Sequence, residues 1–226
     1  MTTGPELHLH HHVEGEGTPV VFTHGFLNTG DVWAGAVAGM DGRARTLYWD
    51  LRGHGGSDPA PVGQYGRSYA LDDLRRMIDV VGRPAVLVGH SLGGYLSLAY
   101  AILHPSEVAG LVMVAGGPGF RNPDSLAQWN VGIDAMTAKR PELPDGVGEI
   151  SKHVDSMVMD RLGEITGPVA VLVGERDKQF VASAAVFRKY LNVVDEVIVA
   201  DMGHMVHAKA PGAVAASVRA VIAALG

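Results

Sequence analysis

Three polar residues of complementary chemistry, Ser91, Asp177 and His204, occur in this order, each soon after a stretch typical of a buried strand. A serine hydroxyl becomes an effective nucleophile when a histidine within hydrogen-bond reach accepts its proton, and an acid must fix the tautomer of that histidine. We therefore expect a catalytic triad, in which Ser91 is the nucleophile, His204 the base and Asp177 the partner of the histidine.

The serine lies in the sequence Gly89-His90-Ser91-Leu92-Gly93, which matches the pattern G-x-S-x-G. In this nucleophile elbow the serine holds a strained backbone on a tight strand-to-helix turn, and crowding requires glycine two positions away on both sides. A plain helix cap, the alternative role for Ser91, would not require both glycines. The turn aims the Leu92 N–H at the space before the hydroxyl, where a helix N-terminus favours an anion. We expect the N–H groups of Leu92 and Phe26, the latter in a loop after an early strand, to form an oxyanion hole.

The segments that would position these residues alternate between strand and helix patterns. We predict an α/β fold, with a mostly parallel central sheet and helices on both faces. In such open sheets functional groups gather at the carboxyl ends of the strands, where the three polar residues fall. The predicted strands cover 7–13, 19–23, 45–49, 85–88, 110–115, 168–173 and 196–200, and the helices 31–40 (with Asp31 as N-cap), 69–81, 91–103, 181–190 and 212–225.

Five motifs at the predicted strand ends resemble those of the α/β-hydrolase fold superfamily, over nearly the whole chain. They are HGF at 24–26, DLRGHGGSD at 50–58, GHSLGG at 89–94, VGERD at 173–177 and MGHMVH at 202–207. The resemblance is to a serine-nucleophile, carboxylesterase-like or C–C hydrolase-like member. It implies the same roles for the three triad residues and for the backbone N–H groups of Leu92 and Phe26. It also implies that residues 121–166 form a short helical lid, inserted into a core made of 1–120 and 167–226.

Neighbouring residues compete for two of the roles. His207 is a rival of His204, but only position 204 has the spacing of the family pattern. Glu175 and Asp201 are rivals of Asp177, which lies at the family's G-x-x-D spacing.

Four side chains are candidates for an apolar substrate pocket: Phe26, Trp129, Met136 and Met205. Methionine-rich walls adapt to varied ligands, which favours tolerance over tight selection. Residues 121–166 carry five basic and eight acidic side chains, a balance that disfavours a lid built to clamp polyanions.

A run of histidines, His8-Leu9-His10-His11-His12, raises the alternative of a metal site. Alternate residues of a strand share one face, so three of the imidazoles could meet a zinc or nickel ion. No carboxylate lies at matching spacing, and the run is far from Ser91 in the predicted topology. We therefore expect no metal and no cofactor.

Composition excludes several classes of protein. The 226 residues can build one sizeable core, and 47% hydrophobic with 19% charged residues is typical of a globular chain. A net charge of −6 without a basic stripe argues against nucleic acid. No apolar run approaches the roughly 18 residues of a membrane span, and no signal-peptide pattern opens the sequence. Zero cysteines exclude disulfides and thiolate chemistry, and we expect a cytoplasmic protein of undetermined oligomeric state.

The leading hypothesis is a carboxylesterase-like serine hydrolase (EC 3.1.1 class) that cleaves small apolar esters through an acyl-enzyme. A C–C bond hydrolase, a lactonase, a thioesterase or a perhydrolase would use the same triad on a related carbonyl substrate. A menaquinone-pathway lyase would need several arginines in the pocket. A ligand-binding receptor without turnover is the alternative from another class.

Overall fold

The computed structural model describes residues 7–40 and 42–226, and their strands form one seven-stranded sheet in the order β1-β3-β2-β4-β5-β6-β7. Only β1 pairs antiparallel, with β3, and every other pair is parallel. The strands are β1 (His11–Glu14), β2 (Thr18–Thr23), β3 (Ala44–Trp49), β4 (Ala85–His90), β5 (Val108–Val114), β6 (Pro168–Gly174) and β7 (Asn192–Val199). β4 and β6 are buried along their whole length, as continuous apolar runs between two helical layers should be.

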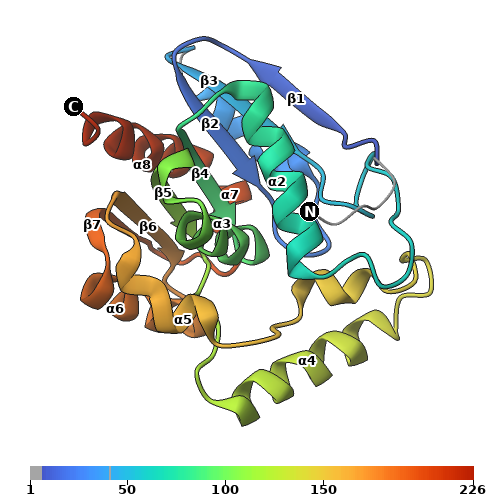
Figure 1. The fold of residues 1–226 in the computed structure, drawn as a ribbon. Helices are drawn as coiled ribbons and strands as arrows, with labels where there is room; N and C mark the ends of the chain where they lie inside the picture. The colour runs from blue at the N-terminus through green and yellow to red at the C-terminus, as the bar shows by residue number, and fades with distance from the viewer. Residues whose placement is uncertain (1–6, 41) are drawn as a thin grey trace.

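Helices cover both faces of the sheet (Figure 1). One buried cluster packs α2, α3 and α6 against the sheet, and a second packs α1 and α8 against the other face. The α-helices are α1 (Ala34–Ala38), α2 (Arg67–Val81), α3 (Leu92–Leu103), α4 (Pro123–Thr137), α5 (Met157–Arg161), α6 (Lys178–Tyr190), α7 (Val206–Lys209) and α8 (Pro211–Ala223). Short 3₁₀ helices are η1 (Gly30–Trp33), η2 (Pro105–Glu107), η3 (Val147–Ser151) and η4 (Leu162–Glu164). The predicted fold class is confirmed.

Four of the predicted elements differ clearly from the structure. β7 begins at Asn192 rather than at 196, and α6 begins at Lys178 rather than at 181. The strand expected over 7–13 is shorter, because the backbone before β1 bonds a loop instead: the His10 N–H donates to Ser57 Oγ at 2.9 Å. The helix expected over 31–40 is split into η1 and α1, and Asp31 lies in the first turn of η1 rather than at its N-cap. Thr29 holds that N-cap position without a side-chain bond.

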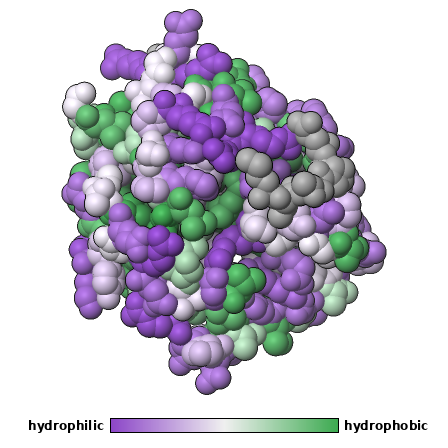
Figure 2. All heavy atoms as spheres, in the orientation of Figure 1, coloured by the Kyte–Doolittle hydropathy of each residue, from purple (hydrophilic) through white to green (hydrophobic). Residues whose placement is uncertain are grey.

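Segment 121–166, between β5 and β6, contains α4, η3, α5 and η4. In Figure 1, α4 lies apart from the sheet, at the lower edge of the molecule. Figure 2, drawn in the orientation of Figure 1, shows apolar residues interspersed with polar ones on this face of the molecule. Over the described ranges, none of the helices has the length and hydropathy that a bilayer crossing needs.

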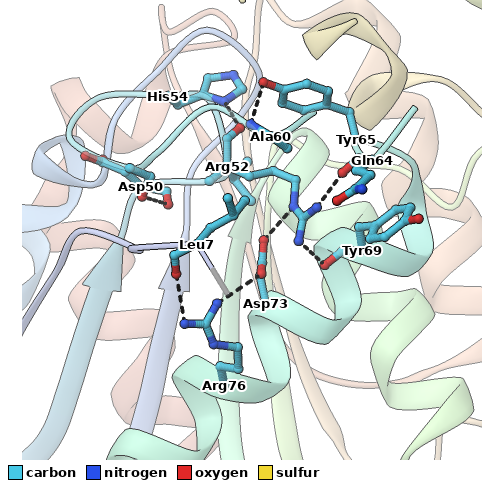
Figure 3. A network of polar contacts seen from close by, with 12 residues as sticks. Leu7, Asp50, Arg52, His54, Ala60, Gln64, Tyr65, Tyr69, Asp73 and Arg76 are labelled. Atoms are coloured by element: carbon cyan, nitrogen blue, oxygen red, sulfur yellow. Dashed lines mark hydrogen bonds and ion pairs between the residues drawn. The ribbon is translucent and has the colours of Figure 1, made fainter. Parts of the chain in front are cut away.

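A buried ion pair fixes the loop after β3 to α2 (Figure 3). Arg52 Nε donates to Asp73 Oδ2 at 2.7 Å, and these side chains are only 6% and 3% exposed. Nη1 and Nη2 each donate one hydrogen bond to a backbone carbonyl, of Gln64 and Tyr69 respectively, so all three guanidinium nitrogens are paired. Asp50, two residues before Arg52, accepts from the Gly30 N–H at 2.6 Å and the Gly56 N–H at 2.8 Å. The DLRGHGGSD motif thus holds together the loops after β2 and β3.

We expect Asp73→Leu to lower the free energy of unfolding by about 3–5 kcal/mol, because it leaves the Arg52 guanidinium buried without its counter-charge. Urea unfolding at pH 7 measures the change. The double variant Arg52→Met/Asp73→Leu should be more stable than Asp73→Leu alone. A loss below about 1 kcal/mol in the single variant would contradict this role.

Candidate active site

Ser91 occupies a sharp turn between β4 and α3, with φ 50° and ψ −111°. Its N–H donates to the Val114 carbonyl at 3.0 Å, which ties the turn to the end of β5. A Cβ on Gly89 would lie 2.3 Å from the Gly93 carbonyl carbon, and one on Gly93 would lie 2.2 Å from the Thr23 oxygen. The two glycines are therefore required by close backbone approach, as the sequence predicted.

His204 and Asp177 meet at the ends of β7 and β6. His204 Nδ1 lies 2.7 Å from Asp177 Oδ2, so Nδ1 carries a proton and donates it to the carboxylate. This tautomer leaves Nε2 as an acceptor, which is the state a general base needs. The Asp177 side chain is 8% exposed and that of His204 41%, so the carboxylate is enclosed while the imidazole stays accessible. The Phe180 ring stacks on the imidazole, with centroids 5.0 Å apart.

His90 links the serine turn to the histidine loop. Its Nε2 donates to the His204 carbonyl at 3.0 Å, and the two rings lie 4.7 Å apart. A Cβ on Gly25 would lie 2.5 Å from His90 Nδ1 and 3.3 Å from the Ser91 Cβ, so the loop that carries Phe26 runs directly against the serine. The structure thus brings Ser91, the loop of Phe26 and the loop of His204 to one end of the sheet.

The predicted oxyanion donors also lie at this end. Leu92 is the first residue of α3, and N–H groups of a helix's first turn have no partner within the helix. The His24 ring shapes the other loop: its Nδ1 donates to the Gly25 carbonyl at 2.7 Å, and its Nε2 accepts from the Leu51 N–H at 2.9 Å.

A cavity of about 120 Å³ opens beside Ser91. Aromatic rings supply much of its wall: those of Tyr95, Phe120, Trp129 and Phe180, together with the imidazole of His153. Four of these residues, Tyr95, Phe120, Phe180 and His153, were not among the four predicted pocket residues. Tyr95 lies four residues after Ser91 on α3, and Phe180 lies in the first turn of α6, so helical spacing could have indicated both. His153 lies outside any helix or strand, and no local pattern indicates it.

The structure separates the four predicted pocket residues. Trp129 lines the cavity beside Ser91. Met136 lines a shallow hollow next to this cavity, and Trp129 lies in the walls of both. The side chains of Phe26 and Met205 are not among the lining of this cavity. The Phe26 ring packs edge-on against His54 instead, with centroids 5.6 Å apart.

Several buried imidazoles surround the site. Burial, followed by the neighbouring His54, lowers the pKa of His24 to about 3. Burial lowers the pKa of His207 to about 4, and burial together with His207 lowers that of His90 well below its ordinary value. The rings of His90 and His207 stack at 3.8 Å, and neither nitrogen of His207 has a partner in the described chain. These histidines are therefore neutral at pH 7. Across residues 7–40 and 42–226, no three side chains group as a metal site.

A family model described as "alpha/beta hydrolase fold" matches residues 18–147, more than half of the chain. The chain belongs to the alpha/beta hydrolase fold family. Among solved structures of the family's fold, a malate-bound thermophilic esterase from Thermogutta terrifontis has a TM-score of 0.80 at 23% identity, covering 99% of this chain and 96% of that one. MenH from S. aureus has a TM-score of 0.79 at 19% identity, with 99% of both chains covered. These likenesses show the fold alone.

Curated relatives of this alpha/beta hydrolase match it only in part. The pimeloyl-[acyl-carrier protein] methyl ester esterase of Nitrosomonas europaea is 34% identical over 134 residues, 57% of this chain and 48% of that protein. The 2-succinyl-6-hydroxy-2,4-cyclohexadiene-1-carboxylate synthase of Salmonella newport is 37% identical over 124 residues, 54% and 48% of the two chains. Each match therefore spans about half the length of the relative.

The lowered histidine pKa values predict that stability falls in acid. Between its folded and unfolded pKa values, each such imidazole binds more protons in the unfolded chain, so the free energy of unfolding rises with pH in that window. For His207, with a folded pKa of about 4 and an unfolded pKa near 6.5, acidification from pH 7 to 5 should cost about 2 kcal/mol.

Urea unfolding measures the free energy of unfolding at both pH values. Between pH 7 and 5, this free energy should fall less in His207→Phe than in the unsubstituted protein. His8→Gln, at an exposed position, is the control and should keep the full dependence. If the free energy of unfolding of His207→Phe depends on pH as strongly as that of the unsubstituted protein, the pH dependence does not come from His207.

Proposed function

We propose that this alpha/beta hydrolase is a serine esterase that cleaves small apolar carboxylic esters through an acyl-enzyme. The observation that carries the proposal is the 2.7 Å bond between Asp177 and His204, formed beside a strained serine turn that opens into a cavity. A solvated loop histidine would not require an enclosed carboxylate on Nδ1, whereas a general base does.

In the proposed mechanism Ser91 Oγ attacks the ester carbonyl while His204 Nε2 takes the hydroxyl proton. Asp177 accepts from Nδ1–H and stabilises the imidazolium that forms. The N–H groups of Leu92 and Phe26 bind the oxyanion. Collapse of the tetrahedral intermediate breaks the C–O bond, and the alcohol leaves with the proton from His204. Water then gives a proton to the same nitrogen and attacks the acyl-enzyme. Collapse of this second intermediate breaks the bond to Ser91 Oγ, which takes the proton back from His204, and the acid is released.

The cavity favours a short acyl group. A volume of about 120 Å³ accommodates several water-sized groups, and its aromatic walls would bury apolar surface. Trp129 and His153, which come from segment 121–166, support the division into a core of 1–120 and 167–226 and a lid of 121–166. The lid would then set the size of the acyl group.

The other carbonyl chemistries share these residues, and fold alone does not choose among them. The lyase alternative would need cationic side chains to hold an anionic substrate. Among the described residues that line the cavity, none is arginine or lysine. A C–C hydrolase, lactonase, thioesterase, perhydrolase or receptor remains an outcome of the tests below.

We expect the protein to hydrolyse p-nitrophenyl esters with sustained turnover, fastest with short acyl chains, and Ser91→Ala to abolish it. Release of p-nitrophenolate measures both. Ser68→Ala, which removes an exposed hydroxyl on α2, is the matched control and should keep full activity. Turnover that survives in Ser91→Ala would overturn the esterase proposal, and a single stoichiometric burst would favour a receptor.

We expect Asp177→Asn to lower kcat about 10³- to 10⁴-fold, because the amide no longer selects the tautomer with a free Nε2. Steady-state kinetics with the best short-chain ester measures the loss. Glu175→Gln, on the same loop, should change kcat less than about twofold. Equal losses in the two variants would contradict the assignment of the acid.

A further inference from the structure

His153 is a buried imidazole in the wall of the cavity beside Ser91. The residue is 8% exposed, and within the described ranges neither ring nitrogen has a hydrogen-bond partner; Nδ1 is closed off completely. Its backbone is fixed by two bonds with Asn130 on α4: the His153 N–H donates to Oδ1 at 2.9 Å, and Nδ2 donates to the His153 carbonyl at 2.8 Å. The ring is thus held in place without any polar contact of its own.

Three aromatic rings hold the imidazole on its sides. The centroids of Tyr95, Phe120 and Trp129 lie 4.3, 5.2 and 5.7 Å from its own, all three close to edge-on. The polar atoms of two of these neighbours are already paired. Trp129 Nε1 donates to the Ser151 carbonyl at 2.8 Å, and the Tyr95 hydroxyl accepts from Arg67 at 2.9 Å. His153 is therefore the buried, unpaired polar group among these aromatic rings.

The surroundings fix the charge and the tautomer of this imidazole. Burial, and then the nearby Arg67, lower the pKa of His153 to about 4, so the ring is neutral at pH 7 and carries one N–H. An unpaired buried N–H is rarer in proteins than an unpaired buried acceptor. Nδ1, the enclosed atom without a partner, is then the unprotonated nitrogen, and Nε2 carries the hydrogen. His153 Nε2 is consequently a hydrogen-bond donor in the aromatic part of the cavity wall, which elsewhere carries the polar side chains of Ser151, Gln179 and Ser183.

We propose that His153 Nε2 donates a hydrogen bond to a second oxygen on the acyl group, so that the preferred substrates are short esters with a keto or hydroxyl oxygen along the acyl chain. This inference rests on the proposed function, because it assumes that the acyl group occupies the cavity beside Ser91. The leaving alcohol must take a proton from His204, whose side chain is 41% exposed, and so departs on the open side. The enclosed, aromatic part of the cavity is then available for the acyl chain.

Binding to the Ser91→Ala protein tests the inference without requiring turnover. The probes are methyl pentanoate and its 3-oxo and 4-oxo derivatives, which differ by one oxygen, and ligand-observed NMR gives the dissociation constants. We expect at least one oxo ester to bind about 2- to 12-fold more tightly than methyl pentanoate, the range of a net neutral hydrogen bond. His153→Phe, added to Ser91→Ala, should bring this ratio to about one while leaving methyl pentanoate binding within about twofold.

Two further variants separate recognition from structure. His153→Gln keeps an N–H donor and should retain part of the preference. His104→Phe, a half-buried imidazole beyond α3, should retain all of it. The inference is overturned if the oxo esters bind no more tightly than methyl pentanoate, if the preference survives in His153→Phe, or if none of the three esters binds. None of these outcomes affects the hydrolysis of plain esters by the unsubstituted enzyme, which tests the esterase proposal separately. Failure of this inference and failure of the esterase proposal are therefore distinguishable.

Discussion

The close approach of three backbone segments at the serine turn is the constraint on which the rest of the structure depends. The end of β4, the start of α3 and the end of β2 come so near one another that a Cβ on Gly93 would lie 2.2 Å from the Thr23 oxygen. This crowding holds Ser91 at φ 50°, a costly conformation for a residue with a side chain. Parallel pairing of β2, β4 and β5 fixes the three segments in register, so the sheet supports the strain that the proposed chemistry requires.

Around this turn, polar groups are held neutral or paired by packing. The Arg52–Asp73 pair and the Asp50 carboxylate fix the loops after β2 and β3. The neutral imidazoles of His90 and His207 stack on each other, and the His90 ring packs against that of His204. A charged imidazole at these positions would be costly to bury and would repel the imidazolium expected on His204 during turnover. The same packing that lowers the pKa values of His90 and His207 therefore serves the proposed base.

How much the sequence predicts depends on whether a residue's role is local. The serine turn, the strand ends and the Asp177–His204 pair follow from glycine spacing, strand periodicity and chain order, which act over a few residues. β1 was predicted to begin too early because the backbone before it bonds the loop at Ser57, which is distant in sequence. The pocket residues were predicted poorly for the same reason. His153 lies in an irregular segment and is held at the cavity by backbone bonds to Asn130, 23 residues earlier in the chain. The Phe26 ring, which was predicted to line the pocket, packs on His54 instead.

The most direct test of the central claim is covalent labelling with a fluorophosphonate, which reacts with a serine only when a neighbouring base activates it. We expect one phosphonyl group per chain by intact mass, mapped to the peptide that contains Ser91, with labelling greatly slowed in His204→Gln. Absence of an adduct, or an adduct at another serine, would contradict the claim that the serine turn, the histidine and the aspartate form one nucleophilic site.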